Sequence, residues 1–205
     1  RSDVAKINGA DLIVYNGLHL EAQMLDMLDR YSKRKPVIAV GDALTGKNLL
    51  PWDGLSHDPH IWMDPGLWAE ALQTAVNALA RLDPQNAAFY RANAVTYFKK
   101  LTALNDGARA AIATIPEHAR ALVTAHDAFG YFGRAYSIDV LAIQGISTES
   151  EAGIRKIELL VNTLVRRQIS AVFAETTVSD RNVRALIEGA AARGHKVRIG
   201  GALFS

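Results

Sequence analysis

The chain has 205 residues, a hydrophobic fraction of 49%, a charged fraction of 21% and a net charge of only +2, which is the composition of an ordinary globular protein with one large domain or two smaller lobes. Without a basic stripe that carries interleaved aromatic residues, nucleic acid is excluded as the expected partner. The absence of cysteine excludes thiolate metal sites, disulfides and cysteine nucleophiles.

No membrane-spanning segment and no signal peptide is visible in the sequence as it stands. No apolar run of about 18 residues occurs, so no membrane-spanning helix is predicted. The sequence opens at "RSDVAKINGADLIVYNG" without methionine, and we interpret it as a mature or trimmed chain from which a signal peptide has been removed. Its location therefore has to be inferred from the kind of protein that the motifs indicate.

The first part of the chain alternates between short apolar runs and helical patterns. Residues 10–17 form an apolar run closed by Asn-Gly, which predicts a buried parallel strand. Residues 20–31 carry apolar side chains at helical spacing, and residues 36–42 predict a second strand. This order is a βαβ unit and predicts a parallel sheet. Residues 43–59 are predicted to be a long loop, and loops of this length in compact domains are usually functional.

A long helix is predicted in the middle of the chain. A first helix over residues 66–82 ends before Asp83-Pro84, and the stretch from 85 to 115 contains no helix breaker except Gly107. About thirty residues at a rise of ~1.5 Å make a rod of roughly 45 Å. The alternatives are a helix lying along one domain and a rigid backbone helix joining two lobes. We favour the second, because strands and helices alternate again beyond Pro116.

The last part of the chain predicts a second, more regular lobe. Strands are expected at residues 121–126, 138–146, 170–176 and 195–201, and helices at 127–136, 150–168 and 179–194. The predicted fold class is therefore α/β, with two parallel-sheet βα lobes joined by one long rigid backbone helix and a ligand cleft between the lobes. The predicted domains are an N-terminal lobe over residues 1–83, a linking helix over 84–116 and a C-terminal lobe over 117–205.

Polar side chains that suit a metal ion occur where predicted strands and the long loop end. His126 ends the first strand of the second lobe, and Glu175 ends the third. His57 and His60 lie in "HDPHIWMDP", at the end of the long loop. Because ligands bind beyond the carboxyl ends of strands in open α/β sheets, these groups are expected near the cleft. Imidazole and carboxylate are suitable ligands for Zn²⁺ or Mn²⁺.

Each histidine also has a purely structural interpretation. His57 and His60 are compatible with loop histidines that hydrogen-bond to their own turn, and His126 with a structural histidine at a strand end. His118 is expected to be solvated. His195 is expected to be structural, because it opens the last strand at the opposite end of the sheet from the cleft.

Five motifs in order resemble the metal-binding solute receptors of bacterial manganese/zinc ABC transporters: "ADLIVYNGLHLE", "HDPHIWMDP", "TAHDAFGYFGRAY", "QGISTESEA" and "GHKVRIGGALFS". The resemblance covers nearly the whole chain. It implies two lobes joined by a long rigid helix and one divalent metal ion in the cleft, which is handed to the membrane subunits of an ABC permease. It also implies an extracytoplasmic location, in the periplasm or anchored at the cell surface, and we expect a monomer.

The same resemblance implies metal ligands by motif. It assigns His60 and His126 as ligands, with His57 as a neighbour. The family's first ligand, a histidine in a "PHxYxP" motif, and its fourth, an aspartate after a motif like "GGALFS", are expected outside this sequence. His19 in "NGLHLE" is a weaker candidate, since this position usually lies beside the site without touching metal. Glu175 is interpreted as an acceptor that orients an imidazole N–H, with direct ligation as the alternative.

The main hypothesis is a binding protein that captures zinc or manganese as cargo and delivers it to a transporter. The rival is a metal-dependent hydrolase in which His60, His126 and Glu175 surround a metal-activated water. No HExxH, GxSxG or P-loop motif supports that rival. An adhesin, a label given to some members of the family, is favoured by no sequence feature. The choice between Zn²⁺ and Mn²⁺ stays open, because imidazole with carboxylate binds both.

Overall fold

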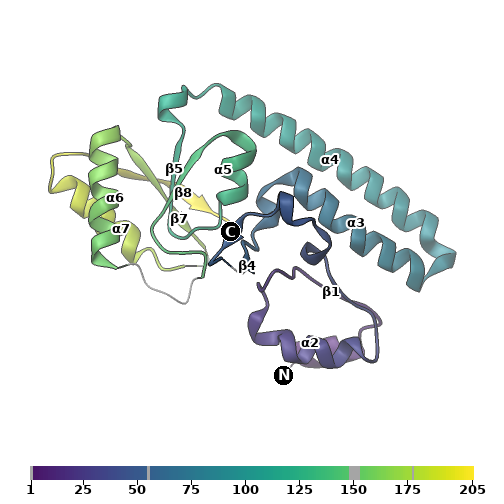
Figure 1. The fold of residues 1–205 in the computed structure, drawn as a ribbon. Coiled ribbons are helices and arrows are strands. Elements are labelled where there is room, and N and C mark those ends of the chain that lie inside the picture. Colours follow the sequence, from purple (N-terminus) through teal and green to yellow (C-terminus); the bar gives the residue numbers. More distant parts are fainter. Residues whose placement is uncertain (1, 55, 148–152, 177) are drawn as a thin grey trace. The chain divides into compact units, whose positions relative to one another are not determined.

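The structure is a computed structural model, and it describes residues 2–54, 56–147, 153–176 and 178–205. The chain divides into two compact units, Arg1–Gly107 and Ala108–Ser205. Each unit combines helices with pairs of parallel strands (Figure 1), so the predicted α/β class is confirmed. The three-part division of the chain stays a prediction. None of the helices in the described ranges is long and apolar enough to cross a membrane.

The first unit contains the predicted βαβ arrangement, preceded by a helix that the sequence analysis did not predict. Its first elements are α1 (Ser2–Gly9), β1 (Ile13–Tyr15), the 3-10 turn η1 (Ala22–Met24), α2 (Leu25–Ser32) and β2 (Val37–Ala39). β1 and β2 pair in parallel, with Ile13 opposite Val37. Both strands are shorter than the apolar runs that predicted them.

Lys35 fixes the end of α1. Its Nζ donates hydrogen bonds to the backbone carbonyl oxygens of Asn8 at 2.7 Å and Ala10 at 2.5 Å, just where the helix ends. An ammonium group at this position satisfies carbonyl groups that lack a partner within the helix, and it interacts favourably with the helix dipole. The short first helix is therefore attached to the segment that leads into β2.

The predicted loop over residues 43–59 is more ordered than the sequence analysis expected. Two 3-10 turns, η2 (Gly41–Ala43) and η3 (Gly46–Asn48), lead to the short antiparallel pair of β3 (Pro51–Trp52) and β4 (Ser56–His57). Asp53 and Gly54 follow β3 with φ angles of 49° and 84°. Asp-Gly is a signal for a tight hairpin turn, so the sequence contained this information.

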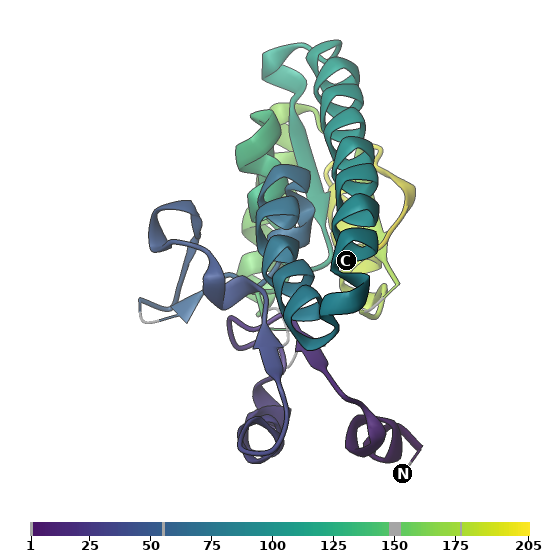
Figure 2. The ribbon, with the colours of Figure 1, turned by 90° about the vertical axis from the view of Figure 1, so that its right-hand side faces the viewer.

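The predicted long helix is confirmed. α3 (Pro65–Leu82) is followed by the 3-10 turn η5 (Pro84–Asn86) and then by α4 (Ala87–Ala113), which is continuous over 27 residues. α3 and the first part of α4 run side by side (Figures 1 and 2). α3 begins where the Asp64 carboxylate accepts the backbone N–H groups of Gly66 and Leu67, with Pro65 at the first helical position, a favourable start for a helix.

Asp83 forms the junction between α3 and α4. Its Oδ2 accepts hydrogen bonds from Asn86 Nδ2 and from the Tyr90 hydroxyl, both at 2.8 Å. The bonds from Asn86 and Tyr90 hold the pKa of the Asp83 carboxyl below its ordinary value, and the bond to Asp83 raises the pKa of the Tyr90 hydroxyl. The ionised carboxylate and the protonated hydroxyl therefore stabilise the turn together.

The second unit is a regular α/β layer. Its elements are the 3-10 turn η6 (Glu117–Ala119), β5 (Ala121–Thr124), α5 (Gly130–Tyr136), β6 (Asp139–Ala142), α6 (Ile154–Arg167), β7 (Ala171–Glu175), α7 (Arg181–Ala191) and β8 (Arg198–Leu203). β5 pairs with β6 and β7 with β8, both in parallel. These pairs are two separate two-stranded sheets, and β5 of one lies beside β7 of the other. The predicted start of the helix over residues 150–168 lies outside the described residues.

Helices α6 and α7 lie beside the strands of the second unit (Figure 1) and pack against them with apolar side chains. The core contains Val123, Ala125, Ile143, Leu160, Val161, Leu164, Val172, Val183, Leu186, Ala190 and Val197. On α6, Leu164 is 1% exposed while Leu159 is 60% exposed. This one-sided burial is what holds the helix against the sheet.

Gly133 allows α5 to approach β6 closely. A Cβ atom at this position would lie 2.7 Å from Val140 Cγ2 and 2.8 Å from the backbone oxygen of Ile138. Gly107 in α4 differs, because a Cβ there would meet nothing within 4 Å. The first glycine is therefore required by packing, and the second is not.

Candidate metal centre

His60 is held in the first unit by a buried carboxylate two residues before it. It precedes the 3-10 turn η4 (Ile61–Met63), in which Ile61 is fully buried. Asp58 Oδ1 accepts the backbone N–H of His60 at 3.0 Å and lies 2.7 Å from Nδ1 of the imidazole. His60 is 4% exposed and Asp58 2%. An aspartate that accepts the N–H two residues further on forms an Asx turn, so the local sequence Asp-Pro-His builds this arrangement.

A residue distant in sequence holds the same stretch in place. The Asn16 side chain, just past β1, donates from Nδ2 to the backbone oxygens of Pro59 at 3.0 Å and Gly17 at 3.1 Å. Glu21 accepts the backbone N–H groups of Asn16 at 2.8 Å and Gly17 at 3.1 Å. The end of β1 and the segment that carries His60 are therefore tied together, as expected for polar groups beyond the carboxyl ends of strands.

His126 in the second unit contacts Glu175, and both residues lie at or just past strand ends. His126 lies two residues past β5 and is 3% exposed, and Glu175 is the last residue of β7 and is 5% exposed. The backbone N–H of His126 donates to Glu175 Oε1 at 2.8 Å, and Nδ1 of the imidazole lies 2.5 Å from Oε2. The two residues meet because β5 and β7 are neighbours.

The Glu175 carboxyl group is stabilised as a carboxylate. Burial alone raises its pKa, but the close contact with the His126 side chain and the hydrogen bonds from the His126 backbone N–H and the Ser205 side chain outweigh burial and hold the pKa below its ordinary value. Hydrogen bonds to a carboxylate favour the charged form. An ionised acceptor therefore faces Nδ1 of His126.

Both histidines face a carboxylate, but one Asp58 oxygen makes both contacts at His60, whereas two Glu175 oxygens share them at His126. A carboxylate oxygen faces Nδ1 of His60 and Nδ1 of His126. In a neutral imidazole one nitrogen carries the proton and the other the lone pair. Protonation of Nδ1, which this contact favours, leaves the lone pair on Nε2, where an imidazole binds a metal ion.

The other candidate residues are placed differently. His57 is partly exposed in β4 and pairs with Pro51, and His19 is exposed with a φ angle of 65°. His118 is exposed in η6. His195 precedes β8 instead of opening it, and its Nε2 lies 2.7 Å from the backbone oxygen of Ile169, a structural contact. Within the described ranges, no group of three or more potential ligand residues is close enough to hold an ion.

Sequence reasoning did not identify the contacts of Asp58 and Asn16. The contact between Asp58 and His60 had a local signal, because aspartate commonly accepts the N–H two residues later in a turn. The hydrogen bond from Asn16 to Pro59 joins residues 43 apart, and no local pattern predicts it.

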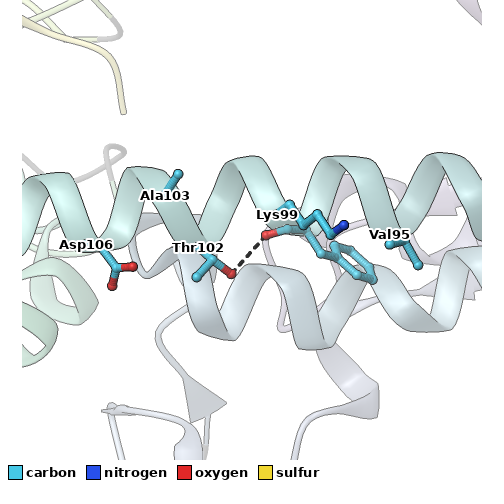
Figure 3. Close-up of a pocket in the computed structure, with 6 residues that line it drawn as sticks. Val95, Lys99, Thr102, Ala103 and Asp106 are labelled. Carbon is cyan, nitrogen blue, oxygen red and sulfur yellow. Dashed lines mark hydrogen bonds between the residues drawn. The ribbon is translucent and has the colours of Figure 1, made fainter.

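A hollow along α4 has a different chemistry (Figure 3). It is lined by Val95, Phe98, Lys99, Thr102, Ala103 and Asp106, and the Thr102 hydroxyl donates to the backbone oxygen of Phe98 at 3.0 Å. Among these lining residues there is one carboxylate and no imidazole. The hollow is therefore not a candidate for a transition-metal ion.

Comparisons with known proteins give a consistent result. The family profile described as "ZnuA: Zinc-uptake complex component A periplasmic" matches residues 1–203. The manganese-binding lipoprotein MntA of Bacillus subtilis (strain 168) is 42% identical over 206 residues, which cover 100% of this chain and 67% of that protein. The zinc-binding protein TroA of Treponema pallidum (strain Nichols) is 37% identical over 203 residues, which cover 99% of this chain and 66% of that protein. The chain thus spans about two thirds of the length of these relatives.

Solved structures show the same likeness. The periplasmic zinc binding protein TroA from Treponema pallidum superposes with a TM-score of 0.96 at 37% identity, covering 100% of this chain and 74% of that chain. Fe(III)-bound YtgA from Chlamydia trachomatis superposes with a TM-score of 0.89 at 28% identity, covering 100% of this chain and 76% of that one.

Proposed function

Because this chain belongs to the zinc-uptake component A family of periplasmic metal-binding solute receptors of ABC transporters, we propose that it captures Zn²⁺ or Mn²⁺ outside the cytoplasm. It delivers the ion, as a monomer, to the membrane subunits of an ABC permease. His60 and His126 are the two ligands that this chain supplies. Glu175 orients His126 and does not bind the ion itself.

The observation that carries this proposal is the contact between His126 and Glu175. A buried glutamate with a lowered pKa accepts the backbone N–H of His126 and faces its Nδ1. Histidines that bind metal commonly direct their second nitrogen to a carboxylate, which fixes the ring and raises its basicity. Both oxygens of the Glu175 carboxylate face His126, and this favours an orienting role over direct ligation.

Two imidazole nitrogens make up half of the four-coordinate shell that zinc prefers. The remaining ligands are expected outside this sequence, as the resemblance to the family implies. Of the two curated relatives, one is named for manganese and the other for zinc. Imidazole nitrogen suits both ions when geometry and availability allow, so the proposal covers both.

The family is one of solute receptors, and we infer that this chain works as a receptor and not as a hydrolase. A transported ion requires a shell made of protein ligands. A catalytic zinc needs an open coordination position with a water and a general base. Glu175 is unsuitable as that base, because its carboxylate oxygens already face the backbone and the ring of His126.

Calorimetric titration of the full-length protein with Zn²⁺ and Mn²⁺ tests the ligand assignment. His60→Ala and His126→Ala are each expected to lose more than the roughly 10- to 100-fold in affinity that removal of an orienting partner costs. His118→Ala is the matched control, since His118 is exposed, and it should bind as the wild type does. Wild-type affinity in either ligand variant would show the proposed site to be wrong.

A further inference from the structure

We propose that Asp58 is a positioning residue for metal capture, which sets the ring orientation and the tautomer of His60 before the ion arrives. This inference rests on the proposed function, because it matters only if His60 binds the ion through Nε2. The simpler alternative is that Asp58 only closes the turn between β4 and η4. The two interpretations differ in what they predict for the imidazole ring.

A single carboxylate oxygen makes both contacts to His60. Asp58 Oδ1 accepts the backbone N–H at 3.0 Å and lies 2.7 Å from Nδ1. Closing the turn needs only the first of these bonds. The second fixes the ring, since a half-turn of the imidazole would place a carbon where Nδ1 now lies and would lose the hydrogen bond.

Burial strengthens the preference for one tautomer and one ring orientation of His60. The side chains of His60 and Asp58 are 6% and 3% exposed. A buried carboxylate without hydrogen-bond donors is costly, so Asp58 favours the tautomer that directs a proton toward it. The edge of the Trp62 ring also packs against His60, with ring centroids 5.2 Å apart. The ring is therefore restrained by a hydrogen bond and by an aromatic neighbour.

The position of the whole segment is restrained from another part of the unit. Asn16, which is 9% exposed, donates to the backbone oxygen of Pro59, between Asp58 and His60. The backbone N–H of Asp58 donates to the backbone oxygen of Leu50 at 2.9 Å. These bonds hold the carboxylate at a fixed place, from which it can act on the ring.

A comparable arrangement occurs at His126, where two oxygens of one carboxylate make the two contacts and the carboxylate comes from a different place in the chain. Glu175 lies 49 residues away, and its carboxylate also accepts the histidine's own N–H and faces its Nδ1. At His60 the carboxylate is two residues away. A turn motif alone would explain the contact at His60 but not the contact at His126, and this favours a common role in orienting a ligand.

The tautomer of His60 is measured directly by long-range ¹H–¹⁵N NMR on the metal-free, full-length protein with ¹⁵N-labelled histidine. In the wild type we expect the proton of the neutral ring on Nδ1. Asp58→Ala should lose this preference and should bind Zn²⁺ about 10- to 100-fold more weakly. Asp58→Asn keeps an oxygen acceptor at Oδ1, so it should keep the tautomer and lose less affinity than Asp58→Ala.

Asp53→Asn is the matched control. Asp53 lies in the same loop and is exposed, and it accepts the backbone N–H of Ser56 at 3.2 Å. The control removes one negative charge from the loop without touching the His60 ring, and it should leave both tautomer and affinity unchanged. Circular dichroism establishes which variants are folded. If Asp58→Ala is not folded, the position of the His60 proton in the wild type and in Asp58→Asn still tests the inference.

A wild-type His60 that carries its proton on Nε2 would overturn the inference, whatever the variants show. So would a folded Asp58→Ala variant with an unchanged tautomer and unchanged Zn²⁺ affinity. The proposed function fails by a different result, namely wild-type affinity in His60→Ala. If His60→Ala loses the metal while the tautomer is independent of Asp58, the inference alone is wrong.

Discussion

Leu164 and Leu159 provide a matched test of how α6 packs on the sheet of the second unit. Both lie on the same helix, but Leu164 is 1% exposed and Leu159 is 60% exposed. Leu164→Ala removes three carbon atoms from the core, which costs about 2.4 kcal/mol at ~0.8 kcal/mol per buried methylene. The cavity left behind brings the expected loss to about 3–4 kcal/mol. The same substitution at Leu159 should change the free energy of unfolding by about 0.5 kcal/mol or less.

Urea unfolding followed by circular dichroism measures this difference. All three tryptophans, Trp52, Trp62 and Trp68, lie in the first unit, so tryptophan fluorescence monitors that unit separately. Leu164→Ala should lower the midpoint of the helical signal of the second unit with an unchanged slope. Equal losses for the two variants, or a larger loss for Leu159→Ala, would refute the packing described here for α6.

Three further predictions concern local structure. Lys35→Met should loosen α1 by about 1 kcal/mol, seen as faster amide exchange over residues 2–9, whereas Lys33→Met should leave α1 unchanged because Lys33 pairs with Asp29 on the surface. Gly133→Ala should destabilise the protein by about 1–3 kcal/mol, while Gly107→Ala should stabilise it by about 0.5–1 kcal/mol, because only the first meets close neighbours. A stabilising Gly133→Ala or a destabilising Gly107→Ala would contradict the packing. The pKa of Asp83 is lowered in the folded state, so its carboxylate stabilises the fold above the ordinary value of 3.8, and this contribution is lost as the pH falls through the folded pKa. The stability difference between wild type and Asp83→Asn in urea titrations should therefore be present at neutral pH and disappear in acid, and a difference that persists in acid would contradict the assignment.

Much of the architecture was predictable because each element has a strong local cause. The absence of helix breakers predicted α4, and the helix begins at Ala87 instead of Pro84 because the preceding residues form the 3-10 turn η5. The positions of the strands could be predicted from the apolar runs. Their lengths could not, because a strand extends only as far as its neighbour offers backbone groups for pairing. The helix α1 was missed, and its contact with Lys35 involves residues 25 to 28 apart.

The candidate site was predictable only in part. His126 and Glu175 were both placed at strand ends, but their contact depends on β5 lying beside β7, which no local pattern determines. The pairing of Asp58 with His60 is local and had a turn signal. Asn16 was visible as a residue after a strand, and its hydrogen bond to Pro59 appears only once the segment is folded.

Anomalous diffraction from crystals of the metal-loaded, full-length protein, recorded at the zinc and manganese absorption edges, tests the central claim most directly. Our account predicts one peak for a single ion, bonded to Nε2 of His60 and to Nε2 of His126, at about 2.0–2.1 Å if the ion is zinc. Asp58 and Glu175 should remain against the Nδ1 atoms, without bonds to the ion. A peak that lies away from either histidine, or an ion bound directly by Glu175 in place of His126, would contradict the account.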